Sequence, residues 1–234
     1  MNLTRPHTWA LASALCAAFA LTAPPALAQT GGLPAPSPDA GSEPVDPEFT
    51  LTARRGVFVG RELRVRGSSP QAAGREVRIE WLDPAGAWQV ATTAQADADG
   101  AFVATWAPAQ IGRFSVRAVL GGGEANTSQA GAARSSVPRD VTVYRSARAS
   151  WYGPGFFGRQ TACGIRLTRR TQGVAHRSLP CGTRVAVAMG GRSVVVRVID
   201  RGPYARGVHW DLTHATAQRI GLEYTRRIGA APLG

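Results

Sequence analysis

The chain of 234 residues contains no lysine, so all 27 of its basic side chains are arginine. After the N-terminal leader described below, no apolar run approaches the ~20 residues that a membrane-spanning helix needs. Cysteine is scarce, with three residues, and histidine amounts to four. No group of these residues shows the close spacing typical of metal ligands, so we expect neither a metal nor a cofactor. The sequence therefore excludes a helical membrane protein and a zinc-type site.

The first 28 residues have the composition of a secretory signal peptide. Arg5 and His7 precede an apolar run, and a small-residue cleavage site ends at Ala28. Cys16 follows Leu15 rather than a small residue, so we expect no lipid anchor there. Residues 29–49 are rich in proline, glycine and acids and predict a disordered linker. We expect a secreted protein of the extracellular or periplasmic space that associates with the cell wall.

Removal of that leader leaves two cysteines, Cys163 and Cys181. Two cysteines in an exported chain predict one disulfide. The alternative is a pair of buried free thiols.

Positive charge is concentrated in the C-terminal part. From Arg148 onward there are 14 arginines against three acids, a net charge of +11 out of the chain's +12. Such a balance favours a polyanionic partner. Outside the cell we expect an anionic wall or membrane surface and no nucleic acid. The alternative is that arginine only keeps the chain soluble. We expect a monomer.

Residues 50–146 predict an immunoglobulin-like β-sandwich. Apolar and polar residues alternate in VRIEW and FSVRAVL, which is typical of half-buried strands, and DPAG and DADG are turn signals. Residues 147–234 predict a small closed barrel, because VAVAM and SVVVRVID are joined by a GG turn. A short helix follows, which Thr213 or Asp211 can cap and Gly221 can end. The fold class is therefore all-β.

Four blocks in this second region carry a resemblance to a known family. ASWYGPGFFGRQTACG, GVAHRSLPCGTRV, VVVRVIDRGPY and WDLTHATAQRIGL occur in this order between residues 149 and 222. Together they resemble the RlpA-like (rare lipoprotein A) family. The resemblance implies a six-stranded double-psi β-barrel and a septal-ring lytic transglycosylase that cleaves peptidoglycan glycan strands. TACG and HWDLT also resemble expansins, which share the barrel but bind and loosen wall polysaccharide without catalysis. The implied partner is peptidoglycan or another anionic wall glycan.

The resemblance also assigns catalytic roles. The AH before LP implies His176, and the DRGP turn implies Asp200 as the acid–base residue. Asp211 matches an expansin groove residue and is a third candidate. The family glutamate falls eleven residues before the histidine, where this chain has Ile165. Other interpretations stay open: Asp200 can bind turn amides or pair with Arg201, Asp211 can cap the helix, and His176 can be structural.

Four further residues are predicted to contact glycan, the first and third by analogy with the expansin groove. These are Thr161, Arg201, Tyr204 and Trp210. Trp151 and Tyr152 are interpreted as core rather than as a sugar platform. The disulfide would then tie the loop after Thr161 to the LPCG turn. Two functions follow: a lytic transglycosylase that uses Asp200, and a non-catalytic, expansin-like wall protein, which Ile165 favours.

Overall fold

The computed structural model describes residues 44–121 and 133–233. The predicted signal peptide and the linker up to residue 43 lie outside these residues. The described part is mostly β, with one α-helix, α1 (His214–Ile220), and one 3₁₀ turn, η1 (Pro70–Ala72). Within it, no helix is both long and apolar enough to cross a membrane.

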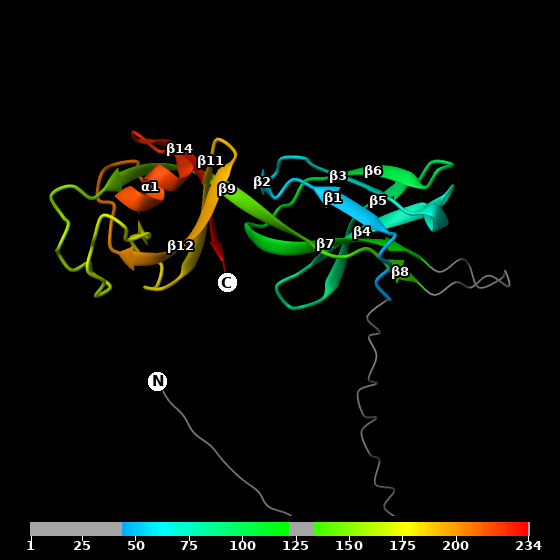
Figure 1. Cartoon of the computed structure of the whole chain (residues 1–234), viewed down its shortest axis with the longest axis horizontal. Coiled ribbons are helices and arrows are strands. Elements are labelled where there is room, and N and C mark those ends of the chain that lie inside the picture. Colours follow the sequence, from blue (N-terminus) through cyan, green and yellow to red (C-terminus); the bar gives the residue numbers. More distant parts are fainter. Residues whose placement is uncertain (1–43, 122–132, 234) are drawn as a thin grey trace, which may run out of the picture. The chain divides into compact units, whose positions relative to one another are not determined.

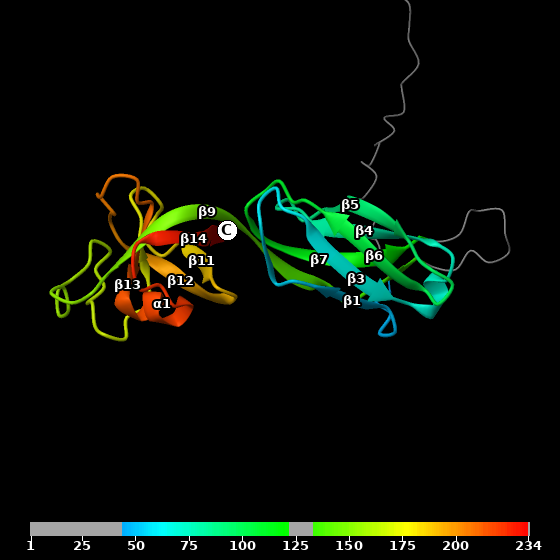
Figure 2. The same cartoon turned by 90° about the horizontal axis from the view of Figure 1, so that it is seen from above.

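The N-terminal region contains two sheets that share one core (Figures 1 and 2). The first joins β1 (Thr50–Ala53), β3 (Leu63–Ser68) and β6 (Ala101–Trp106) in that order. The second runs β9 (Arg139–Tyr152), β7 (Gly112–Leu120), β4 (Glu76–Leu82), β5 (Trp88–Gln95), with β2 (Gly56–Phe58) on β9 and β8 (Arg134–Ser135) on β7. The core forms because alternate apolar residues of both sheets point inward. Its largest fully buried side chains include Phe49, Leu51, Leu63, Val65, Val77, Ile79, Val116 and Val141.

The fold begins before residue 50, at the end of the predicted linker. Val45 forms a β-bridge to Ser135, and Asp46 makes an ion pair with Arg134 at 3.1 Å. The Phe49 side chain is only 2 % exposed, and its ring packs edge-on against Phe102. Residues 44–49 are therefore part of the packed structure, because one aromatic anchor and one ion pair hold them.

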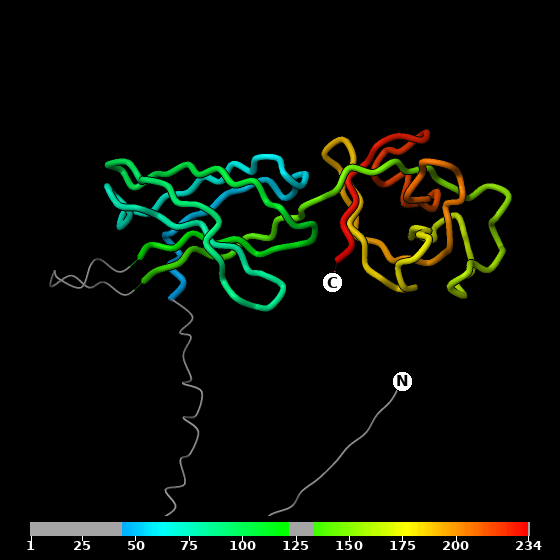
Figure 3. Tube along the Cα trace, turned by 180° about the vertical axis from the view of Figure 1, so that it is seen from behind, coloured from blue at the N-terminus to red at the C-terminus, as the bar shows by residue number. Residues whose placement is uncertain are grey.

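Six strands in the C-terminal region close into a barrel, whose ring is visible in Figure 3. In addition to the end of β9, they are β10 (Val174–Ala175), β11 (Arg184–Met189), β12 (Arg192–Asp200), β13 (Trp210–Thr213) and β14 (Arg226–Leu233). Their order is β13-β10-β12-β11-β14-β9, and a parallel pairing of β13 with β9 closes the ring. This confirms the predicted six-stranded closed barrel with one short helix.

Local signals explain two of these elements. Gly190 and Gly191 both have positive φ, 56° and 79°, as the two-residue turn between β11 and β12 requires. Helix α1 begins after Thr213, whose side chain accepts a hydrogen bond from the Thr216 amide, and ends at Gly221 with φ 76°. Thr213 is therefore the cap, and Asp211 is free for another role.

Strand β9 belongs to both regions. Its first half pairs with β7 and β2, and its second half pairs with β14 and β13. The boundary predicted at residues 146 and 147 lies inside this strand. A small hydrophobic cluster centred on Tyr144, Ala186, Ala231 and Leu233 packs beside it.

Candidate active site

Two aspartates lie on the strands that flank the short strand β10. Ala175 pairs with Asp200 of β12 on one side and with Asp211 of β13 on the other. Neighbouring strands are about 4.8 Å apart, so the backbones of the two aspartates are roughly two strand spacings from each other. The barrel therefore brings together two carboxylates that are eleven positions apart, in a region with only three acids from Arg148 onward.

The carboxylate of Asp200 is held by main-chain donors. Its Oδ1 accepts hydrogen bonds from the amides of Ala162 at 2.9 Å and Arg201 at 2.8 Å. Charge-assisted bonds of this kind fix the orientation of a carboxylate. Asp200 does not form an ion pair with the Arg201 guanidinium, because that guanidinium donates to the carbonyls of His176 and Leu179. Oδ2 is thus the oxygen left to face a ligand or a neighbouring side chain.

Asp211 is half-buried and accepts a hydrogen bond from the Ser150 hydroxyl at 2.9 Å. The pKa of Asp211 is raised from its ordinary value of 3.8 to about 6. Burial is the main cause, the hydrogen bond from Ser150 opposes it, and the charge of Asp200 adds a smaller increase. A carboxyl with a pKa near 6 carries a proton for a substantial part of the time in weak acid. A carboxyl whose pKa is raised by burial is suited to donate a proton in acid–base catalysis.

Tyr152 completes this group. It lies two residues after Ser150 on β9, so both side chains project from the same face of the strand. Its hydroxyl oxygen is buried and has no hydrogen bond of good geometry. Burial, followed by the negative charge of Asp200, raises the pKa of Tyr152 above its ordinary value. A phenol buried beside two carboxylates therefore stays protonated.

His176 lies next to Asp200 through the main chain, since its amide donates to the Asp200 carbonyl at 3.2 Å. Its Nδ1 accepts from the amides of Ser178 at 3.2 Å and Leu179 at 3.0 Å, and its ring packs on Trp210 with centroids 4.5 Å apart. Burial, followed by the nearby arginines, lowers the pKa of His176. The ring is therefore neutral, with its proton on Nε2.

Two arginines brace the loops that carry these residues. The Arg201 Nη1 donates to the carbonyls of His176 at 3.2 Å and Leu179 at 2.9 Å. In return, the Arg177 guanidinium binds carbonyls of the DRGPY loop, at Pro203, Ala205 and Val208. The sequence interpretation missed Arg177, because its charge was counted with the general excess of arginine. Both side chains contribute rigidity to the site.

The remaining predicted residues surround this centre unequally. Thr161 is buried and accepts a hydrogen bond from the Ile165 amide at 3.1 Å, which closes the tight turn that contains Cys163. Tyr204 is 83 % exposed, and Trp210 is only 6 % exposed within the barrel core. No cluster of three or more potential metal ligands occurs in residues 44–121 and 133–233.

Comparison with known proteins identifies this barrel. Residues 144–233 match a double-psi β-barrel family described as "Lytic transglycolase". The probable endolytic peptidoglycan transglycosylase RlpA of Aquifex aeolicus is 51% identical over 76 residues, which cover 32% of this chain and 34% of that protein. Its counterpart in Synechocystis is 53% identical over 76 residues, which are 32% of this chain and 24% of the relative.

The C-terminal region is an RlpA-like double-psi β-barrel domain. The endolytic peptidoglycan transglycosylase RlpA of Neisseria meningitidis serogroup A, 36% identical over 102 residues, extends the match to 42% of this chain and 43% of that protein. The chain thus spans about a quarter to under a half of the length of these relatives.

Within the RlpA-like domain, the predicted disulfide is present. Cys163 and Cys181 are bonded, with Cα atoms 5.7 Å apart. The bond ties the loop after Thr161 to the LPCG turn, which Arg201 also contacts through the Cys181 sulfur. The side chain of Ile165 is 44 % exposed on this loop. The position where the sequence resemblance predicts a glutamate is therefore accessible and carries no charge.

Proposed function

We propose that this protein is a secreted enzyme that cleaves the glycan strands of peptidoglycan by lytic transglycosylation. The observation that supports this is that Asp200 and Asp211 lie on the two strands that flank β10, within an RlpA-like domain. The names of the relatives point to the same substrate, and the disulfide suits an extracytoplasmic location.

The proposed reaction needs one proton donor and one acceptor. The bond between C1 of the cleaved sugar and the bridging oxygen breaks, and the leaving oxygen takes the proton of Asp211. The 6-hydroxyl oxygen of the same sugar bonds to C1 and gives its proton to Asp200, so an anhydro end forms and no water is consumed. Each proton transfer is general acid–base catalysis. His176, neutral and fixed by two amides, offers its Nε2–H to the substrate or to a carboxylate.

Ile165 favours a second candidate, a non-catalytic wall protein of expansin type. Ordinary glycoside hydrolysis uses two carboxylates that flank the bond, and the family glutamate would supply a further one here. An exposed isoleucine cannot donate or accept a proton. In this alternative the same region of the barrel, with Thr161, Tyr204 and the neighbouring Arg201, holds glycan without cutting it. We further propose that the two sheets before the barrel form an immunoglobulin-like spacer, and that the protein is a monomer.

One digest separates the two functions. The protein without its signal peptide is incubated with purified peptidoglycan, intact and stripped of peptides, and released products are identified by mass spectrometry. Asp200→Asn is the matched control, because it keeps an oxygen for the Ala162 and Arg201 amides and removes the charge. Anhydro-ended sugars that disappear in this variant establish the enzyme. Glycan binding with no product from the wild type would refute it in favour of the expansin-like protein.

A further inference from the structure

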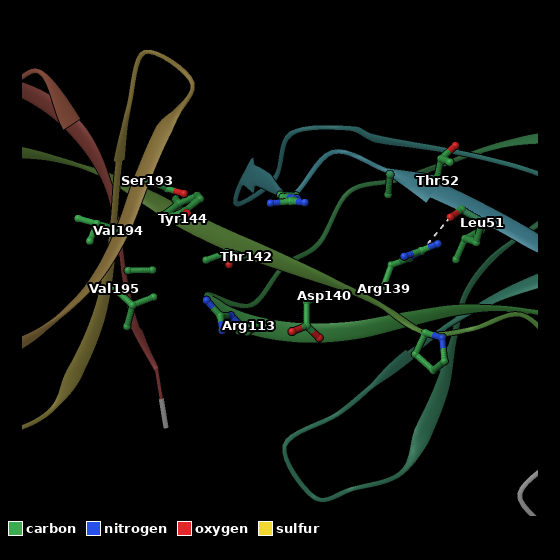
Figure 4. Close-up of a pocket in the computed structure, with 14 residues that line it drawn as sticks. Leu51, Thr52, Arg113, Arg139, Asp140, Thr142, Tyr144, Ser193, Val194 and Val195 are labelled. Atoms are coloured by element: carbon green, nitrogen blue, oxygen red, sulfur yellow. Dashed lines mark hydrogen bonds between the residues drawn. The ribbon is translucent and has the colours of Figure 1, made fainter. Parts of the chain in front are cut away.

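A concave site of about 730 Å³ lies along strand β9, and neither Asp200 nor Asp211 lines it (Figure 4). One wall consists of side chains on β9 and on the strands beside it, and the other belongs to the hairpin strands β11 and β12. The lining includes Arg55, Arg113, Arg139, Asp140, Thr142, Tyr144, Ala186, Ser193, Val194 and Val195. Nothing in the proposed reaction uses this site.

The strand register places two of the arginines on either side of Thr142. Arg113 of β7 pairs directly with Thr142 of β9. On the other side, the Thr142 amide donates to the Arg55 carbonyl at 2.9 Å, just before β2 pairs with β9. Neighbouring strands are about 4.8 Å apart, so the backbones of the two arginines are roughly two strand spacings apart. Both residues line the concave site.

These guanidinium groups are unused within the part of the chain that the structure describes. No hydrogen bond or ion pair occupies the side chain of Arg55 or Arg113 there. The third, Arg139, donates from Nε to the Leu51 carbonyl at 3.2 Å. The one acid in the lining, Asp140, accepts a hydrogen bond from the Ser115 hydroxyl at 3.1 Å. Three positive groups face one negative group, so the site has a net charge of about +2.

The opposite wall is apolar. Val194 and Val195 of β12 and Ala186 of β11 lie there, and only Ser193 adds a hydroxyl. The cluster of Tyr144, Ala186, Ala231 and Leu233 joins this wall to β9 by buried contacts. A ligand that fits has a rigid body with apolar C–H faces and carries anionic groups on one side. Arginine binds carboxylates in a fork-like geometry, through two parallel N–H bonds.

We propose that this site binds a peptide-stripped glycan strand through the carboxylates that its muramic acid residues expose. The strand is the same polymer as in the proposed function but occupies a different site, so that function can fail while this binding site stands. The free guanidinium groups of Arg55 and Arg113 hold carboxylates of the strand, and the valines contact its sugar rings. The protein would thus be anchored on its polymer independently of Asp200.

The test measures equilibrium binding of peptide-stripped strands to the protein without its signal peptide, in the Asp200→Asn background so that no strand is cut. Arg55→Gln/Arg113→Gln removes both free guanidinium groups. Arg61→Gln/Arg219→Gln removes the same charge at exposed positions outside the site. We expect at least a tenfold loss of affinity in the first variant, since two charge-assisted bonds are lost, and less than a twofold loss in the second. Unfolding midpoints of both variants verify that each is folded.

Two further ligands identify the anion. Strands whose carboxylates have been converted to amides should bind the protein with intact arginines as weakly as native strands bind the Arg55→Gln/Arg113→Gln variant. Poly(glycerol phosphate) should bind more weakly than the native strands. Equal losses of affinity in both double variants would mean that only net charge matters, and would overturn the proposed binding site. Unchanged binding of amidated strands, or tighter binding of the phosphate polymer, would overturn the assigned ligand. Cleavage of short soluble glycan by the wild-type and Arg55→Gln/Arg113→Gln proteins should be equal, because the aspartates are untouched.

Discussion

Asp211→Asn is expected to stabilise the protein at neutral pH. In the folded state burial raises the pKa of Asp211 from 3.8 to about 6. Ionisation of this residue therefore lowers the free energy of unfolding, and the loss of stability is complete above about pH 6. A shift of about 2 units corresponds to roughly 3 kcal/mol as an upper bound. Asp211 is partly open to solvent, which screens the effect, so we expect a gain of about 1–2 kcal/mol in the free energy of unfolding.

The sign of the pH dependence follows from the raised pKa. Below about pH 3.8 the carboxyl is protonated in both the folded and the unfolded chain, and the wild type has no such penalty. As the pH rises from 3.8 to about 6, the unfolded chain ionises first, and the wild type loses stability relative to the variant. Asparagine keeps an oxygen that accepts the Ser150 hydrogen bond. The gain should therefore shrink towards zero at about pH 3.5.

The assay is denaturant unfolding of wild type and variant at about pH 3.5 and pH 7, with thermal melts alongside. A gain of 1–2 kcal/mol corresponds to an increase of about 2–8 °C in the melting temperature for a domain of this size. Asp99→Asn, in an exposed turn, is the matched control and should change neither value. A loss of stability at pH 7, or a gain that is the same at both pH values, would refute a raised pKa at Asp211.

Four other predictions concern the same domain. Glycan cleavage should fall as the pH rises above about 6, because Asp211 then loses the proton it donates; a rate that keeps rising to pH 8 would exclude it as the acid. Ile165→Glu should increase the release of anhydro sugars in the digest, and no increase would make the missing glutamate irrelevant to this chain. Reduction of Cys163–Cys181 should lower the free energy of unfolding by about 3 kcal/mol, measured with and without reductant, and two free thiols in the unreduced, unfolded protein would contradict the bond. Tyr152→Phe should leave the free energy of unfolding within about 1 kcal/mol or raise it, since the lost hydroxyl is buried without a well-formed hydrogen bond; a loss above 2 kcal/mol in chemical denaturation would show that the hydroxyl is well bonded.

Local and compositional signals were sufficient for much of the barrel. The GG turn between two β-branched runs, the helix between Thr213 and Gly221, and the pairing of two cysteines are each decided by a few neighbouring residues. The ordered blocks then led to the RlpA-like family. Closure of the ring by β13 on β9 joins residues about 60 positions apart, and no periodicity reveals such a pairing.

The site was only partly predictable for the same reason. Asp200 and Asp211 were predicted because the DRGP turn and the HWDLT segment resemble motifs of the RlpA-like family and of expansins. Tyr152 was interpreted as core, and an aromatic residue in a strand gives no sign that its hydroxyl will lie beside two carboxylates. Arg177 was counted only with the general excess of arginine, and Arg201 was predicted to contact glycan or to pair with Asp200. Both guanidinium groups bind main-chain carbonyls inside the loops. Phe49 was placed in a linker because its neighbours are polar, while one buried ring suffices to order that segment.

Strand β9 has a consequence for recombination of the two regions. A gene fusion that joins this barrel to another module at residue 146 or 147 would cut strand β9. Residues 145–149 of this strand pair with β14, and residues 139–143 pair with β7. The exchangeable cassette must therefore carry the whole of Arg139–Tyr152, and a new partner must accept its first half as an edge of its own sheet. The two regions are therefore not easily inherited as separate units, because they share strand β9.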